Sequence, residues 1–289
     1  MTEGIGCRMG ERPENRRHVS QFEVLPLERT EAEARRLTEP AQLTVTCSPR
    51  HGPDESVDVA RRLCAFGHEV TVHVAARMVR DRAHLDTLLG TMARAGIDDL
   101  FLIGGDATPP EGPYSSAAEL LPVICEHEHR PPRIGIAGYP EGHPQIDDET
   151  LWRALMHKSE CSHYVTTQMC FDPDAILAWI DEARRRGLTL PVLVGVPGQV
   201  DRSRLLKMAM QIGVGSSLKF LRKQRGLLKL FAPSGSPGDR VFDALEPCLD
   251  DPRRNLMGFH FYTFNQLVDT WNWEREKRPG ATLAAGSGV

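Results

Sequence analysis

The chain has 289 residues, and its 35 lysines and arginines against 39 aspartates and glutamates give a formal net charge of −4. This near-neutral balance argues against a nucleic-acid binder that relies on phosphate contacts. Mean hydropathy is −0.34, and no apolar run approaches the roughly 20 residues that span a bilayer. We therefore expect neither a nucleic-acid partner nor membrane insertion.

The seven cysteines include no CxxC pair, and the first residues lack the apolar stretch of a secretory signal. We therefore expect reduced thiols in a cytoplasmic protein. Residues 1–20 are polar and aperiodic, and residues 277–289 are rich in small residues. Both segments are predicted to be flexible, which leaves one domain over residues 21–276.

Short apolar runs with β-branched residues predict eight strands in this domain. They lie at residues 21–26, 42–47, 69–74, 99–104, 133–138, 163–168, 191–196 and 256–261. Stretches with helical periodicity separate most of them, for example residues 57–66, 84–96 and 174–187. The alternation predicts an α/β fold with a parallel sheet. Eight units in about 256 residues favour a (β/α)8 TIM barrel over its main rival, an open doubly wound sheet.

Active sites of such barrels lie at the carboxyl ends of the strands. Polar side chains stand at or just after most of the predicted strand ends, where the interior of a barrel favours Val, Ile and Leu. They are Glu23, Thr46, His73, Asp106, Tyr139, Gln168 and His260. This series predicts a functional site at one mouth of the barrel.

Shorter motifs carry less information. The chain has no P-loop, HExxH or GxSxG motif. GVGSSL (213–218) is interpreted as a loop, and the basic stretch at 219–229 as a solvated helix face that could also steer an anionic substrate. CEHEH (125–129) could attract a metal ion, but the prolines that follow favour a solvated helix end. No metal site is predicted.

Three longer stretches follow predicted strands, at residues 103–116, 136–144 and 258–265. Their backbone amides, tyrosines and histidines beside small residues suit a large aromatic cofactor with a phosphate portion. Together they resemble the methylenetetrahydrofolate reductase family, in its short bacterial single-barrel form. The matching segments occur in family order and include FEVLP (22–26), AGYPEGHP (137–144), TTQMCFD (166–172) and HFYTFN (260–265).

The resemblance implies an oxidoreductase of one-carbon and methionine metabolism. It would interconvert 5,10-methylenetetrahydrofolate and 5-methyltetrahydrofolate by ping-pong hydride transfer through FAD, with NADH or NADPH as electron donor. It implies catalytic roles for Glu23, as general acid, and for Asp106, and substrate contacts at Gln168, Asp106 and Phe264. The FAD contacts that it implies are Thr46, His73, Gly105, Asp106, Tyr114, Ser115, Tyr139, His143 and Lys158.

The chemistry agrees with these roles. Opening the five-membered ring of the folate needs a proton on N10, and a carboxylic acid buried at a strand end, such as Glu23, can donate it. Asp106 can stabilise the iminium cation that accepts the hydride.

The chain also departs from the family pattern. Gly104 stands where the family has an arginine before Gly-Asp, and Leu151 and Ala154 stand where polar FAD contacts are common. Two alternatives therefore stay open: a folate-binding or partner-dependent barrel with little or no flavin, and a reductase that works mainly in the oxidative direction. A homo-oligomer also stays open.

Overall fold

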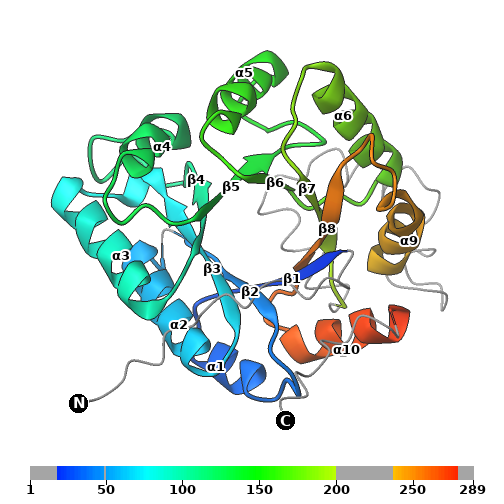
Figure 1. The fold of residues 1–289 in the computed structure, drawn as a ribbon, viewed down its shortest axis with the longest axis horizontal. Helices are drawn as coiled ribbons and strands as arrows, with labels where there is room; N and C mark the ends of the chain where they lie inside the picture. Colours follow the sequence, from blue (N-terminus) through cyan, green and yellow to red (C-terminus); the bar gives the residue numbers. More distant parts are fainter. Residues whose placement is uncertain (1–17, 49, 200–236, 279–289) are drawn as a thin grey trace, which may run out of the picture.

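Eight parallel strands form a closed barrel in the computed structural model, which describes residues 18–48, 50–199 and 237–278 (Figure 1). Neighbours in sequence pair with each other, and β8 pairs with β1 to close the ring. The strands are β1 (Val19–Val24), β2 (Gln42–Val45), β3 (Glu69–Ala75), β4 (Asp99–Ile103), β5 (Arg133–Gly138), β6 (Tyr164–Thr167), β7 (Val192–Pro197) and β8 (Leu256–Tyr262). The predicted barrel is confirmed, and each predicted strand overlaps an observed one.

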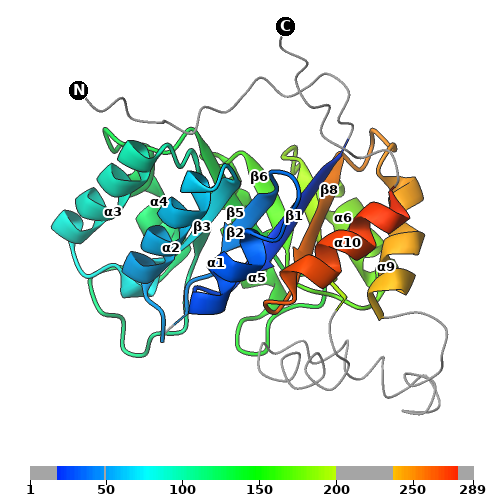
Figure 2. The ribbon, with the colours of Figure 1, turned by 90° about the horizontal axis from the view of Figure 1, so that it is seen from below.

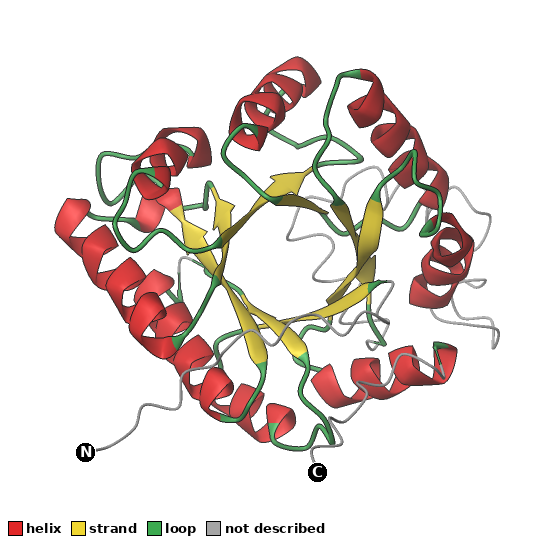
Figure 3. Cartoon of the chain, in the orientation of Figure 1, coloured by secondary structure: helices red, strands yellow, loops and turns green. Residues whose placement is uncertain are grey.

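Helices surround this ring of strands (Figure 3). They are α1 (Glu28–Ala34), α2 (Pro53–Ala65), α3 (Arg82–Ala95), α4 (Ala117–Cys125), α5 (Asp148–Ser159), α6 (Pro173–Arg185), α9 (Pro237–Leu245) and α10 (Leu267–Lys277), with short 3-10 turns η1 (Ala76–Met78) and η2 (Glu246–Cys248). Seen from the side, α2, α1 and α10 stand in a row outside the strands (Figure 2).

Local sequence signals explain where several helices begin. The side chains of Asp81, Ser116, Asp147 and Asp172 accept hydrogen bonds from free backbone amides in the first turns of α3, α4, α5 and α6. Helix α3 ends at Gly96 in the left-handed conformation, with φ of 69°. The four caps at the helix starts mark where the loops that follow β3, β4, β5 and β6 end.

The alternation of side chains along each strand divides the barrel into two layers. Phe22 and Val24 of β1 point outward and join the apolar core under the helices. Gln21 and Glu23 of the same strand instead meet side chains of other strands inside the barrel. The outer layer therefore stabilises the fold, while the inner layer carries the polar groups of the site.

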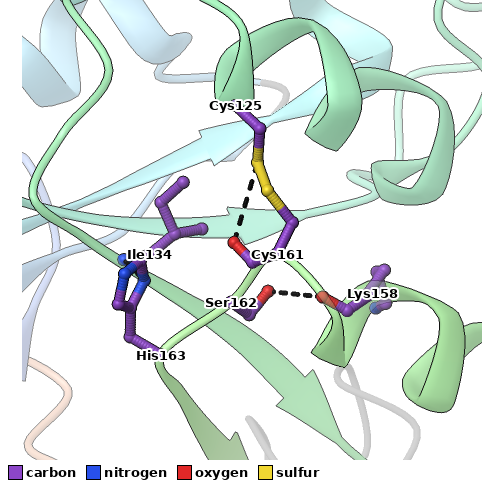
Figure 4. Close-up of a disulfide and its surroundings, with 6 residues drawn as sticks. All are labelled: Cys125, Ile134, Lys158, Cys161, Ser162 and His163. Carbon is purple, nitrogen blue, oxygen red and sulfur yellow. Dashed lines mark hydrogen bonds between the residues drawn. A yellow bond between two sulfur atoms is a disulfide. The ribbon is translucent and has the colours of Figure 1, made fainter.

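One expectation about the cysteines is wrong. Cys125 at the end of α4 and Cys161 before β6 form a disulfide, with Cα atoms 6.7 Å apart (Figure 4). In the same view, Ser162 Oγ donates to the carbonyl of Lys158, and the Ile134 amide donates to His163 Nδ1. The two cysteines are 36 residues apart in sequence, so only the packing of α4 beside α5 brings them together.

The CEHEH segment is a helix end as predicted, because α4 stops at Cys125. It is not fully solvated, however: the His127 side chain is 2% exposed, and its Nε2 lies 2.7 Å from Asp86 Oδ1 on α3. Among the described residues, no group of three or more His, Cys, Asp or Glu side chains could hold a metal ion.

The first described strand, β1, begins at Val19 and the last described helix, α10, ends at Lys277, and the predicted domain limits at residues 21 and 276 stay a prediction. The predicted loop at 213–218 and the basic stretch at 219–229 lie outside the described residues. In the described part of the chain, no helix is both long enough and apolar enough to cross a membrane.

Candidate active site

Glu23 and His260 form the centre of the polar inner layer. Glu23 lies near the carboxyl end of β1 and His260 on the neighbouring β8. Glu23 Oε2 is 3.4 Å from His260 Nε2, and the side chains are 14% and 2% exposed. The other ring nitrogen, His260 Nδ1, lies 2.9 Å from Gln21 Oε1. The carboxyl group of Glu23 is thus held by a buried imidazole while keeping some access to the mouth.

The turn after β8 holds the backbone of this region. The hydroxyl of Thr263 donates to the carbonyl of Glu23, and Asn265 Oδ1 accepts from the Leu25 amide at 2.6 Å. Phe264 and Asn265 both adopt positive φ, at 48° and 59°, which is uncommon for residues other than glycine. Phe264 is 8% exposed, so the predicted substrate contact is largely buried.

His73 of β3 is deeply buried beside this centre. Its ring centroid lies 4.8 Å from that of Phe101, and its Nε2 has no hydrogen-bond partner among the described residues. Burial, with a smaller contribution from His260, lowers the pKa of His73 to about 3. Thr46 Oγ1, just after β2, is also buried without a described partner. Both are polar atoms that a bound molecule could satisfy.

The loops after β4 and β5 bring Asp106 and Tyr139 together. Burial raises the pKa of Tyr139, and the charge of Asp106 adds to that effect. The ring of His143 packs edge-on against Tyr139, with centroids 5.5 Å apart. Asp106 itself is exposed, which leaves its carboxylate open to a ligand.

Gly105 is required by its surroundings. Its φ is 84°, and a Cβ there would lie 2.7 Å from the Cβ of Ala75. The preceding Gly104 differs, because a Cβ there would meet nothing within 4 Å. The loop after β4 is therefore pressed against β3 at one glycine and open at the other.

Arg77, which the sequence analysis did not single out, ties this loop to η1. Its guanidinium donates to the carbonyls of Ala107 and Ser115, at 2.7 and 3.0 Å. The Ser115 hydroxyl donates to Glu119, and Tyr114 packs against the apolar core. Arg77 thus fixes the backbone at Ser115, one of the predicted cofactor contacts.

Gln168 directly follows β6, and its backbone N–H donates to the Gly138 carbonyl at 2.7 Å. Its side-chain oxygen accepts from the backbone N–H of Met169. Beside it, Tyr262 donates to the Thr167 carbonyl at 3.1 Å. Burial raises the pKa of Tyr262 well above its ordinary value, and the charge of Glu23 adds to this. Sequence reasoning missed Tyr262, although its place in HFYTFN was a signal.

Lys158 lies in the last turn of α5, and its carbonyl accepts from Ser162 just before β6 begins (Figure 4). The side chain is buried, and this burial lowers its pKa to about 8. A flavin contact for Lys158 stays a prediction.

A family model described as methylenetetrahydrofolate reductase matches residues 26–214, more than half of the chain. The chain belongs to the methylenetetrahydrofolate reductase family. Family membership agrees with the arrangement at the mouth, where Glu23, Asp106 and Gln168 come from three different strands or the loops that follow them.

Curated relatives bear the same name. Methylenetetrahydrofolate reductase 1 of Schizosaccharomyces pombe is 29% identical over 120 residues, which cover 39% of this chain and 20% of the relative. Methylenetetrahydrofolate reductase (NADH) 1 of Arabidopsis thaliana is 25% identical over 231 residues, covering 68% of this chain and 35% of the relative. The chain thus spans only about a fifth to a third of the relatives it matches.

A solved structure confirms the fold independently of sequence. It is an uncharacterized protein from Clostridium thermocellum that binds two copies of 5-methyl-5,6,7,8-tetrahydrofolic acid. The TM-score is 0.63 at 11% sequence identity, and the match covers 87% of this chain and 90% of that one. At this identity the likeness concerns the barrel alone.

Proposed function

We propose that this chain interconverts 5,10-methylenetetrahydrofolate and 5-methyltetrahydrofolate by flavin-dependent hydride transfer, with Glu23 as general acid. The observation that carries the proposal is the Glu23–His260 pair, a carboxyl group held by a buried imidazole at the mouth of the barrel. Family membership supports it. So does the binding of a methylated tetrahydrofolate by a protein of the same fold.

In the proposed reaction, Glu23 donates its proton to N10 of the folate. The bond between N10 and the methylene carbon breaks, its electron pair goes to N10, and the carbon becomes an iminium joined to N5. Asp106, exposed at the mouth, offsets the positive charge of that iminium. Gln168 offers both a donor and an acceptor to the pterin edge.

The residues at the mouth fit an FAD molecule. His73 Nε2 and Thr46 Oγ1 are buried polar atoms that lack described partners, and Gly105 leaves no room for a side chain beside Ala75. The other residues that would hold FAD are Asp106, Tyr114, Ser115, Tyr139 and His143. When bound and reduced, FAD supplies the hydride for the iminium carbon. NADH or NADPH would be the electron donor.

A second candidate is a folate-binding barrel with little flavin chemistry. One observation favours it: Gly104 has open space where the family pattern places an arginine that would face the cofactor phosphates. Retention of Glu23, Asp106 and Gln168 favours the reductase.

The test begins with the colour of the purified protein. We expect yellow protein that releases FAD on denaturation, or colourless protein that turns yellow with added FAD. Anaerobic NADH or NADPH should then bleach the flavin, and methylenetetrahydrofolate should restore its absorbance. Protein that binds a methylated tetrahydrofolate but no FAD would contradict the reductase and support the second candidate.

A further inference from the structure

We propose that a directed network of hydrogen bonds inside the barrel fixes the tautomer of His260 and so orients the contact between its Nε2 and Glu23. The proposal rests on the proposed function for the role of Glu23 as acid, while the direction of the network follows from the contacts of the protein alone. Its members lie on five strands and face the barrel interior: Asp99, Tyr164, Thr71, Gln21, His260 and Glu23.

The network is anchored at Asp99, which forms an ion pair with Arg133 at 3.7 Å. Tyr164 Oη lies 3.0 Å from Asp99 Oδ1. A carboxylate only accepts hydrogen bonds, so the phenol is the donor in this contact. Burial and then the charge of Asp99 raise the pKa of Tyr164 well above its ordinary value, so the phenol keeps its proton. The direction of the first link is therefore fixed.

The direction passes through Thr71 to Gln21. Because the Tyr164 hydroxyl donates its proton to Asp99, it can only accept in its hydrogen bond with Thr71, and the Thr71 hydroxyl is the donor there. A hydroxyl has one proton, so Thr71 Oγ1 accepts on its other side. The group that donates to it, at 2.8 Å, is Gln21 Nε2. The carbonyl oxygen of the Gln21 side chain consequently faces His260.

This carbonyl selects the form of His260. Gln21 Oε1 can only accept, so His260 Nδ1, at 2.9 Å, carries a proton. In a neutral imidazole the other nitrogen then has a lone pair, and that nitrogen, Nε2, lies 3.4 Å from Glu23 Oε2. A lone pair can pair with a carboxylic acid but repels a carboxylate. The hydrogen-bond network thus presents an acceptor to the carboxyl group of Glu23.

Two other titratable groups, His73 and Tyr262, lie beside Glu23 and His260. His73 interacts with His260, and burial lowers the pKa of His73 to about 3. Tyr262 interacts with Glu23, and burial raises the pKa of Tyr262 well above its ordinary value. Both are uncharged near pH 7. Neither supplies a positive charge that would stabilise an ionised Glu23.

The consequence for the proposed reaction concerns one proton. When Glu23 donates, its O–H bond breaks, an N–H bond forms at N10, and the O–H electron pair stays on the carboxylate. That carboxylate then faces His260 Nε2, and its side chain keeps some exposure at the mouth, from which a proton can return. His260, Gln21 and Thr71 are positioning residues in this scheme, because they act through Glu23.

Nitrogen NMR of the full-length protein tests the hydrogen-bond network directly, without cofactor or substrate. Long-range proton–nitrogen spectra near pH 7 should show His260 neutral, with the proton on Nδ1. His260→Gln assigns its signals among the eleven histidines. A doubly protonated His260, or a proton on Nε2 alone, would overturn the proposal. The spectra are those of the wild-type protein, and the His260→Gln variant serves only to assign the signals.

Thr71→Val supplies the matched perturbation. Valine keeps the shape of threonine but cannot accept from Gln21, so the amide is free to turn over and His260 should become a mixture of both tautomers. Thr44→Val is the control, because Thr44 is the register partner of Thr71 on β2 and its buried hydroxyl has no partner among the described residues. It should match the wild type. A single unchanged tautomer in Thr71→Val would also overturn the proposal.

Kinetics connects the network to the proposed function. Thr71→Val should slow hydride transfer to methylenetetrahydrofolate about ten-fold, which is the size of effect expected when one hydrogen bond is disturbed. Reduction of the flavin by NADH or NADPH should be unchanged, and Thr44→Val should match the wild type in both steps. Equal rates of hydride transfer in Thr71→Val and wild type would contradict the proposed role of the hydrogen-bond network. If neither the wild type nor the variants transferred hydride to methylenetetrahydrofolate, the proposed function would be wrong. The NMR result on the His260 tautomer would still hold.

Discussion

The hydroxyl of Thr263 donates to the backbone carbonyl of Glu23, although the two residues are 240 positions apart in the chain. The bond joins the turn after β8 to β1 at the residue whose carboxyl group faces His260. The general acid of the proposed reaction is therefore held twice, through its backbone by the turn and through its side chain by the imidazole.

Glu23→Gln separates acid chemistry from binding. The amide keeps the size of the carboxyl group but cannot donate an acidic proton. We expect near-normal flavin reduction by NADH or NADPH, and transfer to methylenetetrahydrofolate slowed by at least about 10²-fold. Stopped-flow absorbance of the flavin measures each half-reaction. Equal slowing of both halves would show instead that Glu23 supports the site structurally.

Asp106→Asn removes a charge from the mouth while keeping the shape of the side chain. We expect weaker folate binding, by roughly ten-fold for the loss of one charged interaction. The variant should also lower the pKa of Tyr139, because the charge of Asp106 is the second cause, after burial, of its raised value. Calorimetry and carbon NMR of the tyrosines measure the two effects. An unaltered Kd would leave Asp106 as a turn residue.

Gly104→Arg restores the cation of the family pattern. Nothing lies within 4 Å of a Cβ at this position, so the fold should tolerate the side chain. We expect FAD to bind roughly ten-fold more tightly, in line with one added charge-assisted hydrogen bond. Fluorescence quenching of FAD measures the Kd, and Gly104→Ala is the control, with no gain expected.

Unlike position 104, position 105 should not tolerate a side chain, and Gly105→Ala should destabilise the fold. Its φ of 84° and the 2.7 Å approach to Ala75 make any side chain costly, so the free energy of unfolding should fall by about 1–3 kcal/mol. Urea unfolding measures it. A variant as stable as the wild type would show that the loop relaxes away from β3.

The Cys125–Cys161 disulfide should stabilise the folded chain. It closes a loop of 36 residues, for which the chain-entropy model gives roughly 4 kcal/mol. The double variant Cys125→Ser/Cys161→Ser should lose stability of that order in urea unfolding. Cys248→Ser is the control, since Cys248 is free and partly exposed. Equal stability of both variants would mean that the bridge contributes nothing.

His73 should make the folded state sensitive to acid. Its pKa is about 3 in the fold and about 6.5 in the unfolded chain. Between these values the unfolded state binds the extra proton, so stability falls as pH falls, by up to about 1.4 kcal/mol per pH unit. His73→Gln should reduce this slope in urea unfolding between pH 6 and pH 4. A slope equal to that of the wild type would contradict a buried neutral His73.

The strands and helices were predictable because their signals are local. Alternating apolar residues define β1 and its neighbours, and Asp81 or Asp172 caps a helix within three residues of itself. The predicted strands also placed Glu23, His73 and Asp106 at or just after strand ends. Such signals depend on neighbours in sequence, and the chain alone carries them.

The contacts that give these residues their properties were not predictable in the same way. Gln21 is one polar residue in a strand, and nothing near it in sequence shows that it meets His260, 239 positions away. Cys125 and Cys161 had no recognisable spacing, although they form a disulfide in the fold. Closure of the barrel decides the pairing of Gln21 with His260, because β8 lies beside β1 only once all eight strands have formed the ring. Packing of α4 beside α5 decides the pairing of the two cysteines.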